Sequence, residues 1–153
     1  MKALSTIEID QILKKNSVTR DRFLGTFPSC IYPQTDRKEN SFISNTDYHD
    51  APGRHWIAWY VNQSTVTFFD SFGRAPFNDY FPVQYTDFID KFDRVIYMNG
   101  ALQKSDSVAC GYYCIHFIYV FSLGLTFDSF LEDYYDLKNN DIVATDFVYS
   151  IRY

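Results

Sequence analysis

The segment 110–123 constrains the fold more than any other part of the chain. It reads CGYYCIHFIYVFSL and is apolar on nearly every side, and Gly124, a residue type that often ends helices, follows it. A helix without a polar face must be covered on all sides by other layers of structure. The sequence therefore predicts a core helix that begins at Cys110.

The remaining elements are read from periodicity, caps and turn residues. Helices are predicted over residues 5–15, 85–92, 127–137 and 141–151, and strands over 41–45, 56–61, 66–69 and 94–98. Strands 56–61 and 66–69 are joined across Asn62-Gln63-Ser64-Thr65, which predicts a hairpin. The order of one helix, then strands, then helices favours an α+β fold over alternating βαβ units.

Length and composition bound the class of protein. The chain has 153 residues, of which 46% are hydrophobic and 20% aromatic, so we expect one domain over residues 1–153 rather than a coiled coil or a disordered tail. Nowhere do 18 apolar residues follow one another without a charge, and the N-terminal MKALSTIEIDQILKK carries acids where a signal peptide needs an apolar stretch. We therefore expect an intracellular protein without a membrane span, not a secreted one.

The net charge of −5 is unevenly distributed, because residues 127–153 hold six acids against two bases. An acidic chain without a basic run lacks the positive surface that binding to a phosphate backbone needs, which argues against nucleic acid as a strong partner. We attribute the acidic C-terminal segment mainly to solvated helix faces, although it could also face a basic partner.

Three cysteines cannot all pair, and a disulfide framework is not expected without secretion. Cys114 lies one helical turn after Cys110, so we expect it in the core, and we expect Cys30 to pack under a loop. His116 lies about 200° around the helix from Cys114, which excludes these residues as joint zinc ligands in a regular helix.

Four motifs carry residues suited to nucleophilic catalysis, in the order Gly53-Arg54-His55-Trp56, Phe69-Asp70-Ser71-Phe72-Gly73, Gln103 and Cys110-Gly111. A cysteine at a helix N-terminus beside an imidazolium is favoured as a thiolate. His55 precedes one hairpin strand and Asp70 follows the other, so the carboxylate could orient the imidazole. The amide of Gln103 and the backbone N–H of Cys110 could stabilise an oxyanion, and Gly111 permits close approach.

Single residues in this set also have ordinary structural interpretations. A lone cysteine is usually a small buried hydrophobe, and a lone His or Asp is usually a surface or capping group. Trp56 could wall the site and limit water beside His55, or it could pack in the core. His49 and Asp50 precede Pro52 and are expected to serve a turn.

At these motifs the sequence resembles the adenovirus protease (adenain) family of cysteine endopeptidases, which shares a superfamily with the SUMO-specific proteases. The resemblance runs from the N-terminal helix through Cys114. Besides the four motifs, its matches are Phe23-Leu24-Gly25-Thr26, Asn45-Thr46 and Cys114. It implies an adenain-like fold with a central mixed sheet, Cys110 as nucleophile, His55 as general base, Asp70 as orienting acid and Gln103 as oxyanion donor.

The resemblance also implies an activating peptide or DNA as cofactor. We expect a monomer that is located in the host cell and packaged in the virion. This chain has Val95 near the position where adenain has the cysteine that binds its activating peptide, and the chain is acidic, so the residues themselves require no cofactor. The family's acid is Glu in adenain and Asp in the SUMO proteases, and either carboxylate can hold an imidazole.

From these observations we expect a cysteine endopeptidase of a DNA virus or virus-like element that cuts viral precursor polypeptides. One alternative is an isopeptidase that releases ubiquitin-like modifiers. A second is a non-catalytic binding module on the same fold, and a third is an acyltransferase, although no acyl-carrier signature is present.

Overall fold

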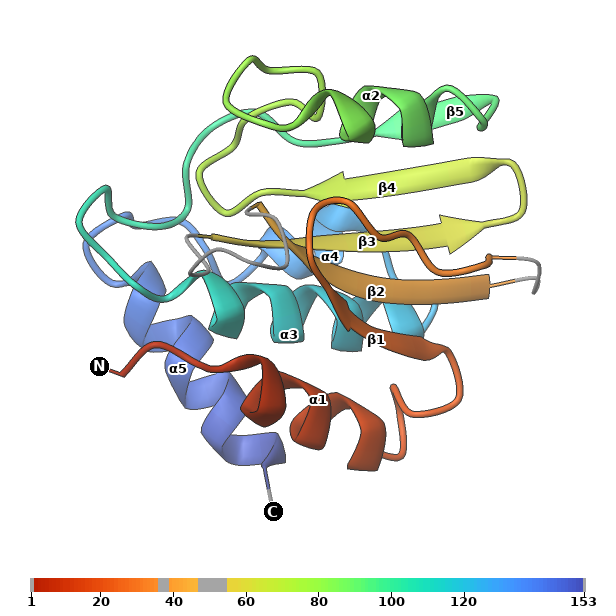
Figure 1. The fold of residues 1–153 in the computed structure, drawn as a ribbon. Coiled ribbons are helices and arrows are strands. Elements are labelled where there is room, and N and C mark those ends of the chain that lie inside the picture. Colours follow the sequence, from red (N-terminus) through yellow and green to blue (C-terminus); the bar gives the residue numbers. More distant parts are fainter. Residues whose placement is uncertain (1, 36–38, 47–54, 153) are drawn as a thin grey trace.

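The computed structural model describes residues 2–35, 39–46 and 55–152, and within them five strands form one sheet in the order β1-β2-β3-β4-β5 (Figure 1). The strands are β1 (Phe23–Phe27), β2 (Glu39–Asn45), β3 (Trp56–Asn62), β4 (Thr65–Phe69) and β5 (Arg94–Ile96). The inner pairs β2–β3 and β3–β4 are antiparallel, whereas the outer pairs β1–β2 and β4–β5 are parallel. The sheet is therefore mixed, as expected.

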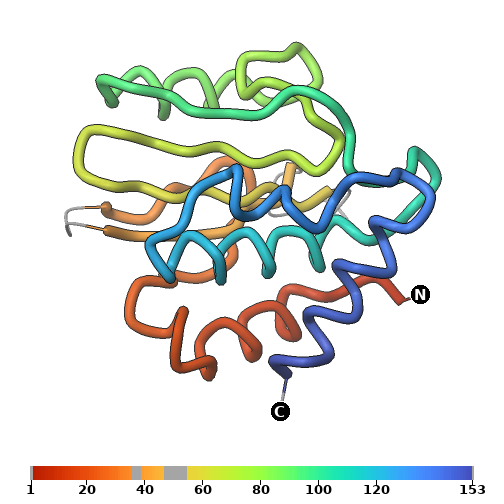
Figure 2. Tube along the Cα trace, turned by 180° about the vertical axis from the view of Figure 1, so that it is seen from behind, coloured from red at the N-terminus to blue at the C-terminus, as the bar shows by residue number. Residues whose placement is uncertain are grey.

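Helices cover both faces of this sheet. They are α1 (Thr6–Lys15), α2 (Val83–Ile89), α3 (Cys110–Ser122), α4 (Phe127–Leu131) and α5 (Asn140–Ile151). Helices α1, α3, α4 and α5 contribute to one apolar core, and α2 contributes to a second core on the other face (Figures 1 and 2). In the described residues, no helix has the length and apolar character needed to cross a bilayer.

Strand β3 shows why the central part of the sequence is apolar throughout. Successive side chains of a strand point to opposite faces, and here each face meets a core. Trp56, Ala58 and Tyr60 pack on the side of α3. The alternate residues Ile57, Trp59 and Val61 belong to the core under α2.

Helix α3 is the core helix that the sequence predicts. Eleven of its residues, among them Cys110, Cys114 and His116, are buried. Phe117 stacks on Phe69 of β4 with ring centroids 5.0 Å apart, which fixes the helix against the sheet. The helix ends before Gly124, whose φ of +82° is favourable only for glycine.

The largest differences between prediction and structure lie in β1, α2 and α4. Strand β1 was not predicted, because Gly25 has a φ of +133° and the register shifts between Phe23 and Thr26. Helix α2 begins at Val83 rather than 85, because the extended Pro82 is its N-cap, and it ends at Ile89 rather than 92. The helix predicted over 127–137 ends at Leu131, after which Tyr134 turns into the core.

The helix predicted over 5–15 is confirmed as α1. Ser5 accepts a hydrogen bond from the backbone of Glu8, and the Glu8 side chain accepts one from the backbone of Ser5, which forms a capping box. The helix predicted over 141–151 is α5, within one residue at its start. The predicted hairpin is also confirmed, and Gln63 supplies its left-handed residue with a φ of 54°.

Candidate active site

His55 and Asp70 meet at one end of the β3–β4 hairpin. His55 directly precedes β3 and Asp70 directly follows β4, and the register pairs Ala58 with Phe69. Antiparallel pairing therefore brings the two side chains together. His55 Nε2 lies 2.6 Å from Asp70 Oδ1, and both residues are buried.

Both carboxylate oxygens of Asp70 accept further hydrogen bonds. Oδ1 accepts one from the backbone N–H of Phe72 at 3.0 Å. Oδ2 accepts from the backbone N–H of Arg74 at 3.2 Å and from Arg74 Nε at 2.9 Å. Four donors thus hold one carboxylate, which fixes its orientation toward the imidazole.

The electrostatics of the pair favour two opposite charges. Burial disfavours the imidazolium of His55, but hydrogen bonds to Asp70 and Cys110, together with their charges, outweigh this and raise the pKa of His55 to about 9. Burial alone would raise the pKa of Asp70, but the hydrogen bond and charge of His55, with help from Phe72 and Arg74, lower it. The pair therefore suits an imidazolium held by a carboxylate.

Cys110 is the first residue of α3, and its side chain lies near enough to His55 to help raise the pKa of the imidazole. Because His55 Nε2 is bound to Asp70, Nδ1 is the ring nitrogen left for the thiol. The N-cap of α3 is Ala109, whose side chain makes no cap bond. Such a helix end favours a negative charge at the sulfur.

Cys114 connects α3 to β3, the strand that directly follows His55. Its Sγ donates to the backbone oxygen of Trp56 over 3.4 Å. Burial raises the pKa of Cys114 well above its usual value, which keeps it a neutral thiol. It thus acts as a core residue, as the sequence predicts.

Gln103 lies between the loop that follows Asp70 and the loop that leads to Cys110. Its side chain is buried, with Oε1 2.6 Å from Ser71 Oγ and Nε2 2.9 Å from the backbone oxygen of Ser107. A carbonyl oxygen can only accept, so the contact with Ser107 fixes the amide with Nε2 toward the Cys110 loop. The same Ser107 also caps Ala109 N–H through its Oγ at 3.0 Å.

Hydrogen bonds from α3 and α5 hold the backbone next to Gln103 in place. Asn140 Nδ2, at the start of α5, donates to the backbone oxygen of Leu102 over 3.2 Å. The hydroxyl of Tyr113, on α3, lies 2.6 Å from Asp141 Oδ1 and 3.1 Å from the same Leu102 oxygen. Asp141 is therefore a buried structural acid, whereas the sequence analysis assigned the C-terminal acids to solvated faces.

Trp56 lies beside the start of α3. Its Nε1 donates to the backbone oxygen of Leu4 over 3.2 Å, and a Cβ placed on Gly111 would lie 3.3 Å from Trp56 Cδ1. Close approach at Gly111 thus agrees with the expectation from sequence. The indole packs against the core on the α3 side, and its role as a wall of the site stays a prediction.

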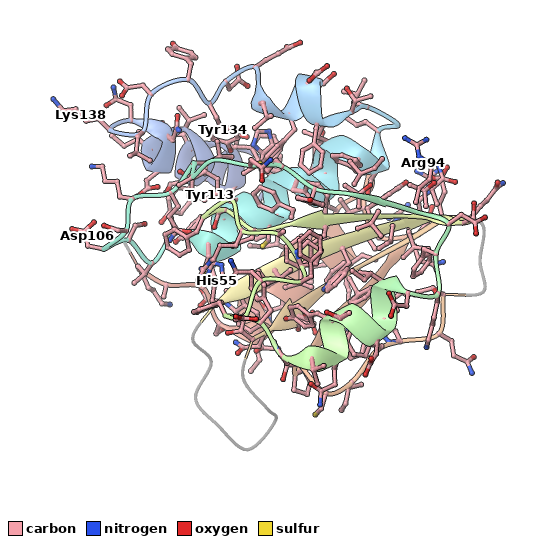
Figure 3. The ribbon with its side chains drawn as sticks, turned by 90° about the horizontal axis from the view of Figure 1, so that it is seen from above. His55, Arg94, Asp106, Tyr113, Tyr134 and Lys138 are labelled. Atoms are coloured by element: carbon pink, nitrogen blue, oxygen red, sulfur yellow. The ribbon has the colours of Figure 1, made fainter. Side chains whose placement is uncertain are left out.

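Sequence reasoning missed several residues of this site, namely Ser71, Arg74 and Ser107. Ser71 could have been noticed because it sits directly after the acid in the Asp-Ser-Phe-Gly motif. Arg74, four residues after Asp70, is a cation near an acid, but only the loop geometry shows that the two meet. Figure 3 shows His55 and Arg94 toward opposite ends of the sheet, with Asp106 on the loop at the His55 end.

Other residues singled out from the sequence lie elsewhere. His116 is buried against Tyr134 and Phe147, and Cys30 is half-buried in the loop between β1 and β2. His49, Asp50, Gly53 and Arg54 lie outside the described residues. In the part of the chain that the structure describes, no three His, Cys, Asp or Glu side chains are grouped to hold a metal ion.

Known proteins share sequence and fold with this chain. The sequence model of the family described as "Adenovirus endoprotease" matches residues 23–131. The chain is 31% identical over 137 residues to a protease of bovine adenovirus 7, an alignment that covers 79% of this chain and 66% of that protein. The chain thus spans about two thirds of the length of this curated relative.

Among solved structures, the ASFV protease superposes with a TM-score of 0.58 at 16% identity, over 94% of this chain and 67% of that one. This likeness confirms the predicted fold. The SUMO protease Ulp1 superposes with a TM-score of 0.49 at 15% identity, over 95% of this chain and 74% of that one.

Proposed function

The chain belongs to the adenovirus endoprotease family, and on this premise we propose that it is a cysteine endopeptidase whose catalytic residues are Cys110, His55 and Asp70. The observation that carries the proposal is the buried pair of His55 and Asp70, 2.6 Å apart, next to the thiol that begins α3. A buried carboxylate, imidazole and thiol in this order supply an orienting group, a base and a nucleophile.

The reaction is acyl transfer through a thioester. His55 takes the proton of Cys110, and the thiolate attacks the carbonyl carbon of the scissile peptide bond. The C–N bond then breaks, and the leaving amine takes the proton from His55. Water next attacks the thioester while giving a proton to His55, and the C–S bond breaks to restore Cys110.

Asp70 and Gln103 would form no covalent bond with the substrate and would instead stabilise the charges that develop during the reaction. Asp70 holds the ring so that Nδ1 faces the sulfur, and its negative charge stabilises the imidazolium that forms in each half of the reaction. Gln103 Nε2, aimed toward the Cys110 loop, and the backbone N–H of Cys110 would donate to the oxyanion. Removing one such donor costs roughly 2.7–4 kcal/mol in other hydrolases.

The family points to precursor polypeptides of a DNA virus or virus-like element as substrates. It also points to cleavage near small residues such as glycine, and to a site of action in the host cell and the virion.

The test is a digest of a panel of glycine-containing peptides and ubiquitin-like fusions by the wild type, Cys110→Ala and Cys30→Ala. Cys30 is a matched control because it is a thiol in a loop that is not part of the site. We expect cleavage of peptides by the wild type and Cys30→Ala, and none by Cys110→Ala. Cleavage by Cys110→Ala would contradict the catalytic assignment, and exclusive release of the ubiquitin-like fusions would favour an isopeptidase.

A second measurement addresses the nucleophile without a substrate. Alkylation by iodoacetamide at neutral pH should label Cys110 faster than Cys114, whose buried thiol has a raised pKa. Equal labelling of the two would contradict an activated thiol at Cys110.

A further inference from the structure

The second oxygen of the Asp70 carboxylate is held by one side chain. Oδ1 serves His55 and the backbone of Phe72, and Oδ2 accepts from the backbone and from Nε of Arg74. The backbone donors belong to the loop and remain when side chains are changed. The guanidinium, 2.9 Å away at Nε, is the side chain that fixes Oδ2.

Arg74 is itself held by three aromatic rings. Its guanidinium carbon lies 3.6 Å from the ring centroid of Tyr80, and 5.2 Å and 5.4 Å from those of Phe72 and Phe81. A cation over an aromatic face is attracted to the ring, more strongly when it is partly removed from water. The Arg74 side chain is 25% exposed, so its position is set by the rings and the carboxylate together.

Two of these rings also flank the histidine. Phe72 lies 5.0 Å and Tyr80 6.5 Å from the His55 ring, measured between centroids. The cation, the carboxylate and the imidazole are thus packed into one unit on the loop after β4. Displacement of the Arg74 side chain would remove the side-chain donor of Asp70 Oδ2 and loosen the rings beside His55.

We propose that Arg74 is a positioning residue for the catalytic group: held by Tyr80, it fixes the Asp70 carboxylate, and through it the charge and orientation of His55. The inference rests on the proposed function, because it assigns to Arg74 an effect on the reaction of Cys110. Arg74 touches neither the nucleophile nor the reacting atoms in this arrangement, so it acts through Asp70.

The charged and titratable groups around His55 and Asp70 decide whether the loss of Arg74 raises or lowers the pKa values of these two residues. They are Arg74 and Tyr80 on the loop after β4, Tyr85 on α2, and Cys110 and Cys114 on α3. Burial raises the pKa of Tyr85 and of Cys114, so both stay neutral near pH 7. The positive charge of Arg74 lowers the pKa of Asp70 and disfavours the imidazolium, so its loss should raise the pKa of both Asp70 and His55.

The experiment compares kcat and KM against pH for the wild type, Arg74→Ala, Arg74→Gln, Arg74→Lys and Arg94→Ala. Arg94 is the matched control because it lies at the other end of the sheet (Figure 3). We expect Arg74→Ala and Arg74→Gln to lower kcat roughly tenfold, with KM within about twofold, and to move both limbs of the pH profile upward. Arg74→Lys should restore the limbs and part of kcat, and Arg94→Ala should match the wild type.

The pH profiles of kcat in the Arg74 variants decide the outcome. An unmoved profile in both Arg74→Ala and Arg74→Gln would overturn the proposal, as would a lowered kcat that Arg74→Lys does not restore. The proposed function fails in a different way, through an inactive wild type or an active Cys110→Ala. Thermal unfolding of each variant identifies any that does not fold, and Arg74→Lys, which keeps the charge, then decides.

Discussion

The hydroxyl of Ser71 donates to Gln103 Oε1 across 2.6 Å, joining the residue next to the proposed acid to the proposed oxyanion donor. Both side chains are fully buried, and the backbone oxygen of Ser71 also accepts from the N–H of Leu102 at 2.8 Å. Hydrogen bonds therefore join the loop that follows Asp70 to the loop that contains Gln103. These hydrogen bonds set the direction of the amide before any substrate is present.

Ser71→Ala should lower kcat about tenfold with little change in KM. The substitution leaves Gln103 Oε1 buried without its donor, which costs about 1–3 kcal/mol and loosens the amide that faces the oxyanion. Alkylation of Cys110 should be unchanged, because the thiol itself is not touched. Steady-state kinetics and the alkylation rate check the two halves of this expectation.

The matched control is Ser122→Ala, since in the described residues Ser122 is also a buried serine and its hydroxyl has no hydrogen-bond partner. It should keep the activity of the wild type. A Ser71→Ala enzyme with wild-type kcat would show that the amide of Gln103 does not depend on Ser71.

Gly73→Ala should destabilise the protein and misplace the loop that follows Asp70. Gly73 has a φ of +74°, and an added Cβ would lie 2.3 Å from the backbone oxygen of Gly100. Real structures cannot hold this contact, so the loop must move, at a cost of about 1–3 kcal/mol beyond the left-handed strain. Urea unfolding measures the loss in the free energy of unfolding.

Gly124→Ala separates the two causes. Gly124 has a similar φ of +82°, but a Cβ there would meet nothing within 4 Å. It should therefore show the backbone strain alone, about 1 kcal/mol. Equal losses for Gly73→Ala and Gly124→Ala would mean that the close approach to Gly100 does not matter.

The sequence predicts the meeting of His55 and Asp70 because both flank one short hairpin, whose register follows from its turn. It predicts the core position of α3 because no face of that helix is polar. Strand β1 is different, since it pairs in parallel with a strand beyond an intervening loop and contains Gly25, so no local pattern marks it. Tertiary packing of Tyr134 likewise shortens α4, against the helical spacing of its sequence.

The roles of Arg74 and Ser71 could not be predicted for a related reason. Both depend on the path of an irregular loop, in which the backbone N–H groups of Phe72 and Arg74 turn back to the carboxylate of Asp70. Residue spacing alone places Arg74 near Asp70 but cannot say which oxygen it contacts or that Tyr80 lies under it.

Asp70→Asn should lower kcat/KM for two reasons, the loss of the negative charge and the loss of hydrogen-bond acceptors. Each oxygen of Asp70 accepts from two donors. In Asn one of these oxygens is replaced by an NH₂ group, which is itself a donor and cannot accept from the two donors that face it. Without the carboxylate the pKa of His55 should fall from about 9. We expect the alkaline limb of kcat/KM to move to lower pH, as a pH series on the variant would measure.

Asp106→Asn is the control for this prediction, because Asp106 is an exposed acid on the loop before α3 (Figure 3). It should leave the alkaline limb in place. If Asp70→Asn also leaves the limb in place, the carboxylate does not govern the charge of His55.

His116 should make the stability of the fold depend on pH. The ring is buried, stacks on Phe147 with centroids 4.0 Å apart and shares a hydrogen bond with Tyr134. Burial disfavours its imidazolium and lowers its pKa to about 4, although the charge of Asp133 opposes this. The neutral ring is thus the form that the folded protein accommodates.

Stability should therefore fall as the pH drops from about 6.5 to about 4. The unfolded chain takes up the proton of His116 near its ordinary pKa of 6.5, and the folded chain only near about 4, so protons favour unfolding in this window by on the order of 3 kcal/mol. His55 acts in another window: its pKa is raised to about 9, so its stabilisation is complete below about 6.5 and is lost as the pH rises through about 9. Urea unfolding at several pH values should show the acid loss in the wild type and in Tyr134→Phe, which keeps the imidazole, but much less of it in His116→Phe. The carboxylates contribute equally to all three proteins, so an unchanged acid slope in His116→Phe would contradict a neutral buried His116.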